Sequence, residues 1–466
     1  MKFSIYFIWT LQVILWISFG PMVHFADSLY QVNLAENFVH GAFQFDHHYF
    51  DHRFFVFGPT AFISGLLGFS KITVNLWPLI CSMGITYLLH AILPKERWSS
   101  VLISMWAVYS PSIIYSSILL PDIPLTFVSL LYYYYSIHSQ KHQPMLLAGV
   151  LLLGVFTKIS FLLLIPAIII AQWISQPEKI KMQLGSVGIG LGIFFSFYQW
   201  VFGNWLFRFQ LAEELHNKHF KEWPNSTDKI NRLTNEWWEF ISNDGLLWFG
   251  LVVSIVAIYA FIQKKITPGL TVAAILFLFY SFGSTSIQQY TPMPILSRIW
   301  LPVTVFIMIG LADWKKEIRL SQQTWLFLFI ATIVAIPFNS LGIAMCMSLF
   351  TVFFIPFPFR LPTLFIQLTY AGIFLFHNSN QLDKNNEFSI IEELKGRTLY
   401  LQDDLYDNQK YFFETNAEVK RQSEYEKKKG SYVIIKRNIF TDLDAKFLQE
   451  NELEKVQSKG KLEIWE

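Results

Sequence analysis

Long apolar segments recur along most of this chain, and they constrain its fold more than any other feature. A helix needs about 20 mostly apolar residues to cross the hydrocarbon core of a bilayer. The pattern therefore predicts an all-α polytopic membrane protein with about 11–13 transmembrane helices, of which some are short. The apolar runs cover residues 3–20, 72–93, 99–118, 122–137, 145–157, 159–175, 183–203, 245–262, 268–283, 299–312, 323–338, 341–356 and 361–376.

Charged residues divide the chain into two predicted domains. Hydrophobic residues make up 53% of the sequence and charged residues only 15%. Nearly half of the charged residues nevertheless lie after residue 376. We therefore predict a transmembrane body over 1–376 and a small extracytoplasmic α/β domain over 377–466, with strands near 398–402, 431–436 and 462–465 and a helix near 441–454. The net charge of +2 gives no reason to expect a nucleic-acid partner.

The positions of the basic residues predict the orientation of the body. With the N-terminus inside, the short inner loops carry most of the Lys and Arg residues, as the positive-inside rule requires. These residues are Lys2, Lys95, Arg97, Lys141, Lys179, Lys181, Lys264, Lys265, Lys315, Lys316, Arg319 and Arg360. Two long outer loops follow, 21–71 and 204–244. In the second, aromatic and charged residues alternate, which predicts amphipathic helices at the interface.

Four charged residues fall at the predicted outer ends of spans. Asp27 follows the first span, Asp122 lies in the next outer loop, and Lys158 and Arg298 lie in later ones. Ionisable groups near membrane depth are costly and usually functional. The alternatives are that the acids cap helices and that the cations anchor span ends. A transporter would place polar groups within its spans, so this clustering at one face favours chemistry at the interface.

Five segments in order resemble the lipid-linked-sugar glycosyltransferases with the GT-C fold. The branch concerned holds the protein O-mannosyltransferases (glycosyltransferase family 39) and the bacterial lipid A aminoarabinose transferase. The similar segments are Asp-Ser-Leu-Tyr…Gly at 27–41, His-Arg…Gly-Pro at 52–59, Leu-Pro-Asp-Ile-Pro at 120–124, the run ending in Thr-Lys at 148–158, and Ser-Arg-Ile-Trp-Leu-Pro at 297–302.

The resemblance implies an integral-membrane enzyme, in a bacterial inner (plasma) membrane, whose active site faces outward. It would move a sugar from a polyprenyl-phosphate donor to an extracytoplasmic lipid, glycan or protein by inverting displacement. Asp27 and Asp122 are the expected catalytic residues. Lys158, Arg298 and Arg53 are expected to bind the donor phosphate, because a departing phosphate needs cations. The alternatives are a flippase or transporter of a lipid-linked glycan, or an O-antigen ligase- or polymerase-like enzyme.

The same resemblance raises the question of a divalent cation. In that family the acids are associated with a metal ion, so Asp27 and Asp122 would hold Mg²⁺ or Mn²⁺. This chain has Ser28 where the family often has Glu, which weakens the case for a tightly bound metal. The nearby Asp and His residues of 46–52 fit no standard zinc spacing.

Overall fold

A computed structural model describes residues 5–21, 23, 27–45, 48–94, 97–139, 143–220, 232–243, 245–284, 296–317, 394, 397–402, 418–425, 431–436, 447–459 and 462–465. The chain divides into two compact units, Met1–Ala371 and Gly372–Glu466. The predicted boundary at 376/377 lies outside the described residues, as do the apolar runs predicted at 323–338, 341–356 and 361–376.

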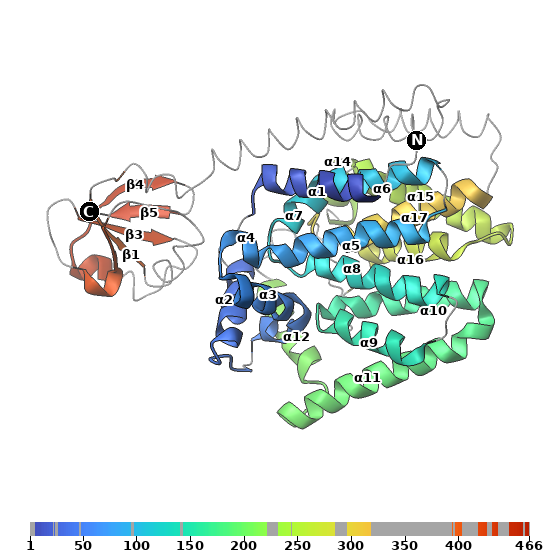
Figure 1. Ribbon diagram of the computed structural model, residues 1–466, viewed down its shortest axis with the longest axis horizontal. Coiled ribbons are helices and arrows are strands. Elements are labelled where there is room, and N and C mark those ends of the chain that lie inside the picture. Colours follow the sequence, from blue (N-terminus) through green and yellow to red (C-terminus); the bar gives the residue numbers. More distant parts are fainter. Residues whose placement is uncertain are drawn as a thin grey trace, which may run out of the picture. The chain divides into compact units, whose positions relative to one another are not determined.

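The first unit is a bundle of apolar helices (Figure 1). Every apolar run predicted before residue 313 coincides with one or two of them. They are α1 (Ile5–Phe19), α5 (Leu76–Ile92), α6 (Arg97–Val108), α7 (Ser110–Ser116), α8 (Asp122–Tyr133), α9 (Pro144–Val155), α10 (Leu164–Ser175), α11 (Ile180–Phe202), α15 (Gly245–Ile262), α16 (Pro268–Phe282) and α17 (Leu301–Glu317).

Helix length limits how many of these elements could cross a bilayer unaided. Within the described part of the chain, two helical stretches are long and apolar enough, Lys71–Ile92 and Pro177–Phe202. The other apolar helices span 10–17 residues. Two predicted spans are interrupted: in 99–118, α6 ends before Tyr109, and in 159–175, the 3₁₀ turn η3 (Ile159–Leu163) precedes α10.

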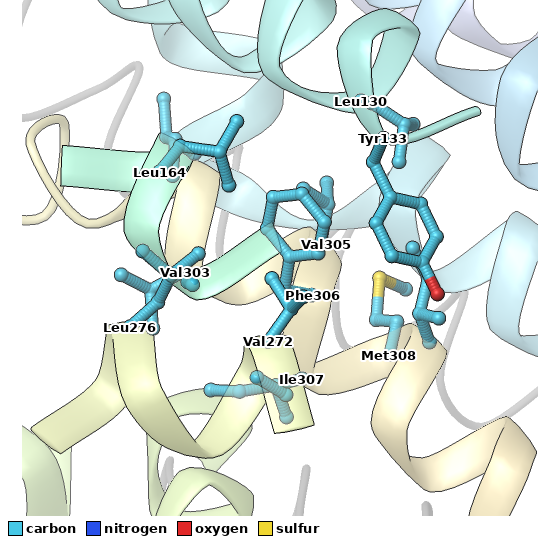
Figure 2. Close-up of a cluster of buried hydrophobic side chains, with 14 of the residues drawn as sticks. Leu130, Tyr133, Leu164, Val272, Leu276, Val303, Val305, Phe306, Ile307 and Met308 are labelled. Carbon is cyan, nitrogen blue, oxygen red and sulfur yellow. The ribbon is translucent and has the colours of Figure 1, made fainter. Parts of the chain in front are cut away.

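The core of the bundle lies where α16 and α17 pack against α8 and α10. Figure 2 shows Leu130 and Tyr133 facing Val305, Phe306 and Met308 across this contact. The rings of Tyr133 and Phe306 meet edge to face, with their centroids 5.3 Å apart. Lipid is as apolar as these side chains, so close packing and hydrogen bonds hold such helices together.

Polar side chains inside the bundle bond to one another between helices. The Gln12 amide on α1 donates to the Ser82 hydroxyl on α5 at 3.2 Å, and Thr86 donates to the Gln12 oxygen at 2.9 Å. The Trp16 indole donates to the Ser116 carbonyl at 2.9 Å. These bonds fasten α1 to α5 and α7, and they satisfy groups that lipid could not.

Short helices form one end of the bundle, where the outer loops were predicted. The first predicted loop contains α2 (Asp27–Val39), the 3₁₀ turn η1 (Tyr49–His52), α3 (Phe54–Leu67) and α4 (Lys71–Val74). The sequence pattern predicted an outer loop at 21–71 and did not assign these helices within it. The apolar run in α3 is too short to span a bilayer, but a helix still satisfies its backbone near the interface.

The described residues of the second predicted loop contain helices as expected, namely α12 (Phe207–Phe220), the π-helical turn η5 (Arg232–Glu236) and α14 (Trp237–Asn243). Figure 1 shows α2, α3 and α12 together at one end of the long helices. Contacts of η1 with α2 and α12 join the two loop regions.

The second unit contains a five-stranded sheet in the order β2-β1-β3-β5-β4. β1 (Thr398–Leu401) is parallel to β2 (Glu418–Arg421) and β3 (Ser431–Lys436), while β5 (Leu462–Trp465) is antiparallel to β3 and β4 (Lys455–Lys459). The three predicted strands are confirmed. The sequence did not predict β2 and β4, because edge strands carry charges that hide their pattern. Of the helix predicted at 441–454, residues 447–450 are helical and 441–446 are not described.

Two glycines of α9 provide a matched test of this packing. A Cβ at Gly154 would lie 2.5 Å from the Phe161 ring, whereas a Cβ at Gly149 would meet nothing within 4 Å. We expect Gly154→Ala to lower the melting temperature in detergent, because overpacking costs about 1–3 kcal/mol. Gly149→Ala should leave it unchanged or raise it, since alanine favours helix. Equal melting temperatures would contradict the packing described for Gly154.

Candidate active site

A buried ion pair joins two of the predicted residues at one end of the bundle. Asp122 is the first residue of α8 and Lys158 follows α9. The Lys158 Nζ lies 2.9 Å from Asp122 Oδ1, and the two side chains are 18% and 2% exposed. Pro121 occupies the N-cap position of α8, and no side chain there makes a capping bond. The Asp122 carboxylate thus pairs with Lys158 and does not cap α8.

A second ion pair joins the other two predicted residues and is more open. Asp27 begins α2, and Arg298 lies in the turn before α17. The Arg298 Nη2 lies 3.3 Å from Asp27 Oδ2, and the side chains are 29% and 39% exposed. Beside Arg298, the hydroxyls of Ser297 and Tyr115 are 3.2 Å apart. The Asp27 carboxylate thus remains accessible while a cation holds it.

The two ion pairs belong to one electrostatic region. Burial alone would lower the pKa of the Arg298 guanidinium, but the Asp122 and Asp27 carboxylates raise it above its usual value. Both carboxylates therefore act electrostatically on Arg298, although Asp122 is paired with Lys158. The structure brings together four residues that are spread over 272 positions of the sequence.

Arg53 is the fifth predicted residue, and it lies in the same region. Its side chain is 5% exposed, and its guanidinium lies 4.0 Å from the centroid of the Phe50 ring. The pKa of Arg53 lies below its usual value, mainly because the side chain is buried. The Tyr49 phenol, Asp27 and Asp122 oppose this shift, and Arg208 adds to it. Within the described residues, the buried Arg53 Nε has no hydrogen-bond partner.

Arg208 is a site residue that the sequence did not reveal. It lies in α12 among aromatic residues, a pattern that predicts an interfacial helix, yet it is fully buried. Its Nη1 donates to the Tyr49 carbonyl, and its guanidinium lies 4.1 Å from the centroid of the Tyr49 ring. In the part of the chain that the structure describes, its Nε and Nη2 have no partner. Arg208 is recognised as a site residue only in the structure, where its guanidinium is buried and some of its N–H donors are unused.

The side chain of Tyr49 lies among the cations. Burial raises the pKa of its phenol, but Arg208, Arg53 and Lys158 together bring it below the usual value. The Arg53 guanidinium lies 5.1 Å from the centroid of the Tyr49 ring. The phenol of Tyr49 is thus close enough to Arg208, Arg53 and Lys158 to be affected by the positive charge of all three.

The donor set does not fit a tightly held divalent ion. Among the described residues, no three His, Cys, Asp or Glu side chains are placed to hold a metal. Asp27 and Asp122 each face a cationic side chain instead of each other. The described members of the 46–52 cluster have other contacts, with Asp51 bonded to Tyr30 and His52 to Tyr198. Asp46 and His47 lie outside the described residues.

Solved structures share this architecture. No protein-family model matches, and neither does any curated protein. Two crystal structures of ArnT from Cupriavidus metallidurans do match, each over 98% of this chain and 97% of ArnT at 12% identity. The TM-score is 0.51 for the apo structure and 0.53 for ArnT bound to undecaprenyl phosphate.

The chain has the GT-C fold. ArnT has this fold. The expected GT-C architecture is therefore confirmed. At 12% identity this likeness shows the arrangement of the helices alone.

Polar groups next to Asp27 are buried without partners. Ser28 and Gln31 are fully buried on α2. The Ser28 hydroxyl and both polar atoms of the Gln31 amide have no hydrogen-bond partner among the described residues. Buried polar groups normally have partners, so this side of α2 keeps unused hydrogen-bonding capacity beside the Asp27 carboxylate.

The two ion pairs should differ in their effect on stability. Lys158→Met leaves the buried Asp122 carboxylate unpaired, which costs about 3–5 kcal/mol. Arg298→Met affects a pair open to water, which is worth at most about 1 kcal/mol. We expect a clear fall in detergent melting temperature for Lys158→Met alone, with partial recovery in Lys158→Met/Asp122→Asn. Equal falls for the two single variants would contradict the burial described.

Proposed function

We propose that this protein is an integral-membrane glycosyltransferase that moves a sugar from a polyprenyl-phosphate donor to an extracytoplasmic acceptor. The observation that carries the proposal is a cluster of four cations around two carboxylates at one end of a GT-C bundle. The likeness to ArnT, solved with undecaprenyl phosphate, supports a lipid-linked donor. The acceptor is a lipid, a glycan or a protein.

The two buried arginines suit the donor phosphate. Lys158 and Arg298 already face carboxylates, whereas neither Arg53 nor Arg208 forms an ion pair with a described residue. A sugar leaving a polyprenyl phosphate gives its bonding electrons to a phosphate oxygen, which gains negative charge. Arg53 and Arg208 present unused N–H donors toward that charge, and charge-assisted bonds of this kind are strong.

Asp27 is the proposed residue for the acceptor, because its carboxylate is the more exposed of the two. The acceptor oxygen or nitrogen attacks the anomeric carbon, and its proton passes to Asp27. The bond from the anomeric carbon to the phosphate oxygen breaks on the opposite side, so the configuration inverts. Arg298 holds the carboxylate in place before the attack.

Asp122 is proposed to act through Lys158. Its carboxylate is almost fully buried and bonded to the Lys158 ammonium, which fixes that cation toward Tyr49 and the arginines. Lys158 then contributes to the positive field around the phosphate. This assignment makes Asp122 a positioning residue, where the sequence predicted a catalytic one.

We propose that a divalent cation is not required for transfer, since each acid already has a cationic partner and the described donors do not converge. A flippase or transporter is the competing function. The charged cluster lies at one end of the bundle, which supports interfacial chemistry over passage through the bilayer. An O-antigen ligase-like enzyme would instead use a polyprenyl-diphosphate donor.

Asp27→Asn should abolish transfer of radiolabelled sugar from polyprenyl-phosphate donors in membranes that contain matched amounts of protein. Loss of a general base costs about 10²–10⁴-fold in rate. EDTA should leave wild-type transfer intact, and activity restored only by Mg²⁺ or Mn²⁺ would contradict the metal-independent proposal. Movement of a lipid-linked sugar across vesicles without transfer would support the flippase instead.

Arg53→Gln and Arg208→Gln should each raise the KM for the donor by about 10- to 100-fold, because each removes a charge-assisted bond worth about 1.5–3 kcal/mol. Lys181→Gln, at an exposed position on α11 predicted to face inward, is the matched control and should change nothing. The measurement is steady-state transfer at varied donor concentration. A change in acceptor KM alone would place the arginines elsewhere in the reaction.

A further inference from the structure

We propose that η1 is the positioning element of the active site, held by the hydroxyls of Tyr30 and Tyr198. The proposal rests on the proposed function. It assigns to four residues outside the ion pairs, namely Tyr30, Asp51, His52 and Tyr198, the task of fixing Asp27 and Arg53 relative to each other.

Three residues of this short turn bind three different helices. The Tyr49 carbonyl accepts from Arg208 on α12, Asp51 accepts from Tyr30 on α2, and His52 contacts Tyr198 on α11. Asp51 is 1% exposed and His52 is fully buried. A four-residue turn has little structure of its own, so these contacts determine where it lies.

The first contact bears on Asp27. The Tyr30 hydroxyl donates to Asp51 Oδ1 at 2.6 Å, and the Tyr30 ring lies tilted beside the His48 ring with centroids 4.3 Å apart. Tyr30 follows Asp27 by three positions on α2, so the two side chains leave the same face of the helix. The bond therefore fixes the beginning of α2, from which the half-exposed Asp27 carboxylate projects.

The second contact bears on Arg53. The His52 Nδ1 lies 3.0 Å from the Tyr198 hydroxyl. The rings of Phe45, Phe202 and Phe207 surround His52, with centroids 4.7, 5.6 and 5.8 Å away. Arg53 is the next residue, and its N–H donates to the Phe50 carbonyl at 3.1 Å. Any shift of His52 would move the Arg53 guanidinium directly.

One turn thus connects the acceptor side of the site to the phosphate side. The two hydroxyls should control different steps, because Tyr30 acts on the base and Tyr198 on a cation that binds the donor. A purely structural role would lower stability without separating kcat from KM.

The test removes one oxygen atom at a time. We expect Tyr30→Phe to lower kcat about 3- to 10-fold with little change in donor KM. Tyr198→Phe should raise the donor KM by a similar factor with little change in kcat, as expected for the loss of one hydrogen bond. Tyr132→Phe is the matched control, since its buried hydroxyl accepts from Gln183 on α11 but no charged site residue contacts it. It should leave both parameters unchanged.

Asp51 supplies a rescue experiment. Asp51→Asn keeps an oxygen that can accept from Tyr30 and should retain most of kcat, whereas Asp51→Ala should behave like Tyr30→Phe. If the tyrosine variants change kcat and KM together, or no more than Tyr132→Phe does, the proposal is overturned.

A binding measurement separates this proposal from the proposed function. Purified protein should bind undecaprenyl phosphate more weakly in Tyr198→Phe, while Tyr30→Phe should match the wild type. If wild type transfers no sugar but this binding pattern holds, the proposed function fails and the positioning role of η1 stands. Equal binding by all variants, beside normal wild-type transfer, would overturn the positioning role alone.

Discussion

The burial of positive charge at one end of an apolar bundle is the constraint on which the rest of this structure depends. Arg53 and Arg208 are removed from water, and each desolvated guanidinium costs several kcal/mol unless it is compensated. Aromatic faces, the Tyr49 carbonyl and the Asp122–Lys158 pair supply part of that compensation. The unused N–H donors are a cost to stability that binding an anion would remove, and such strain is typical of functional sites.

The apolar helices make this arrangement possible by excluding water around it. Phe54, Phe156 and Phe197 pack together beside Arg53, where α3, α9 and α11 meet, with ring centroids 5.5–6.5 Å apart. In such surroundings the effective dielectric constant is low, so each charge acts more strongly than it would in water. The same end of the bundle orders η1, because the Asp51 and His52 side chains bond to α2 and α11 and the Tyr49 carbonyl accepts from Arg208 on α12.

The sequence predicted the membrane body and the placement of four charged residues at one face for physical reasons. Apolar runs and basic inner loops set the topology, and topology alone brings Asp27, Asp122, Lys158 and Arg298 to one face. Arg208 and Tyr49 escaped prediction because they are 159 residues apart and neither has a local pattern that differs from an interfacial helix or a polar loop. The apolar pattern did not assign α2 within 21–71 or α4 at its end, because α2 is polar and α4 is only four residues long.

Ser28 explains why positive side chains carry so much of the proposed chemistry. The families that this chain resembles often have a second acid beside the first-loop aspartate, and here that position holds a buried hydroxyl. Removing one negative charge there makes the local field more positive. Four cations around two carboxylates can then neutralise a departing phosphate directly, where a site richer in acids would need a divalent ion to do so. We infer that Ser28 and the buried arginines together allow positive side chains to stabilise the negative charge of the departing phosphate.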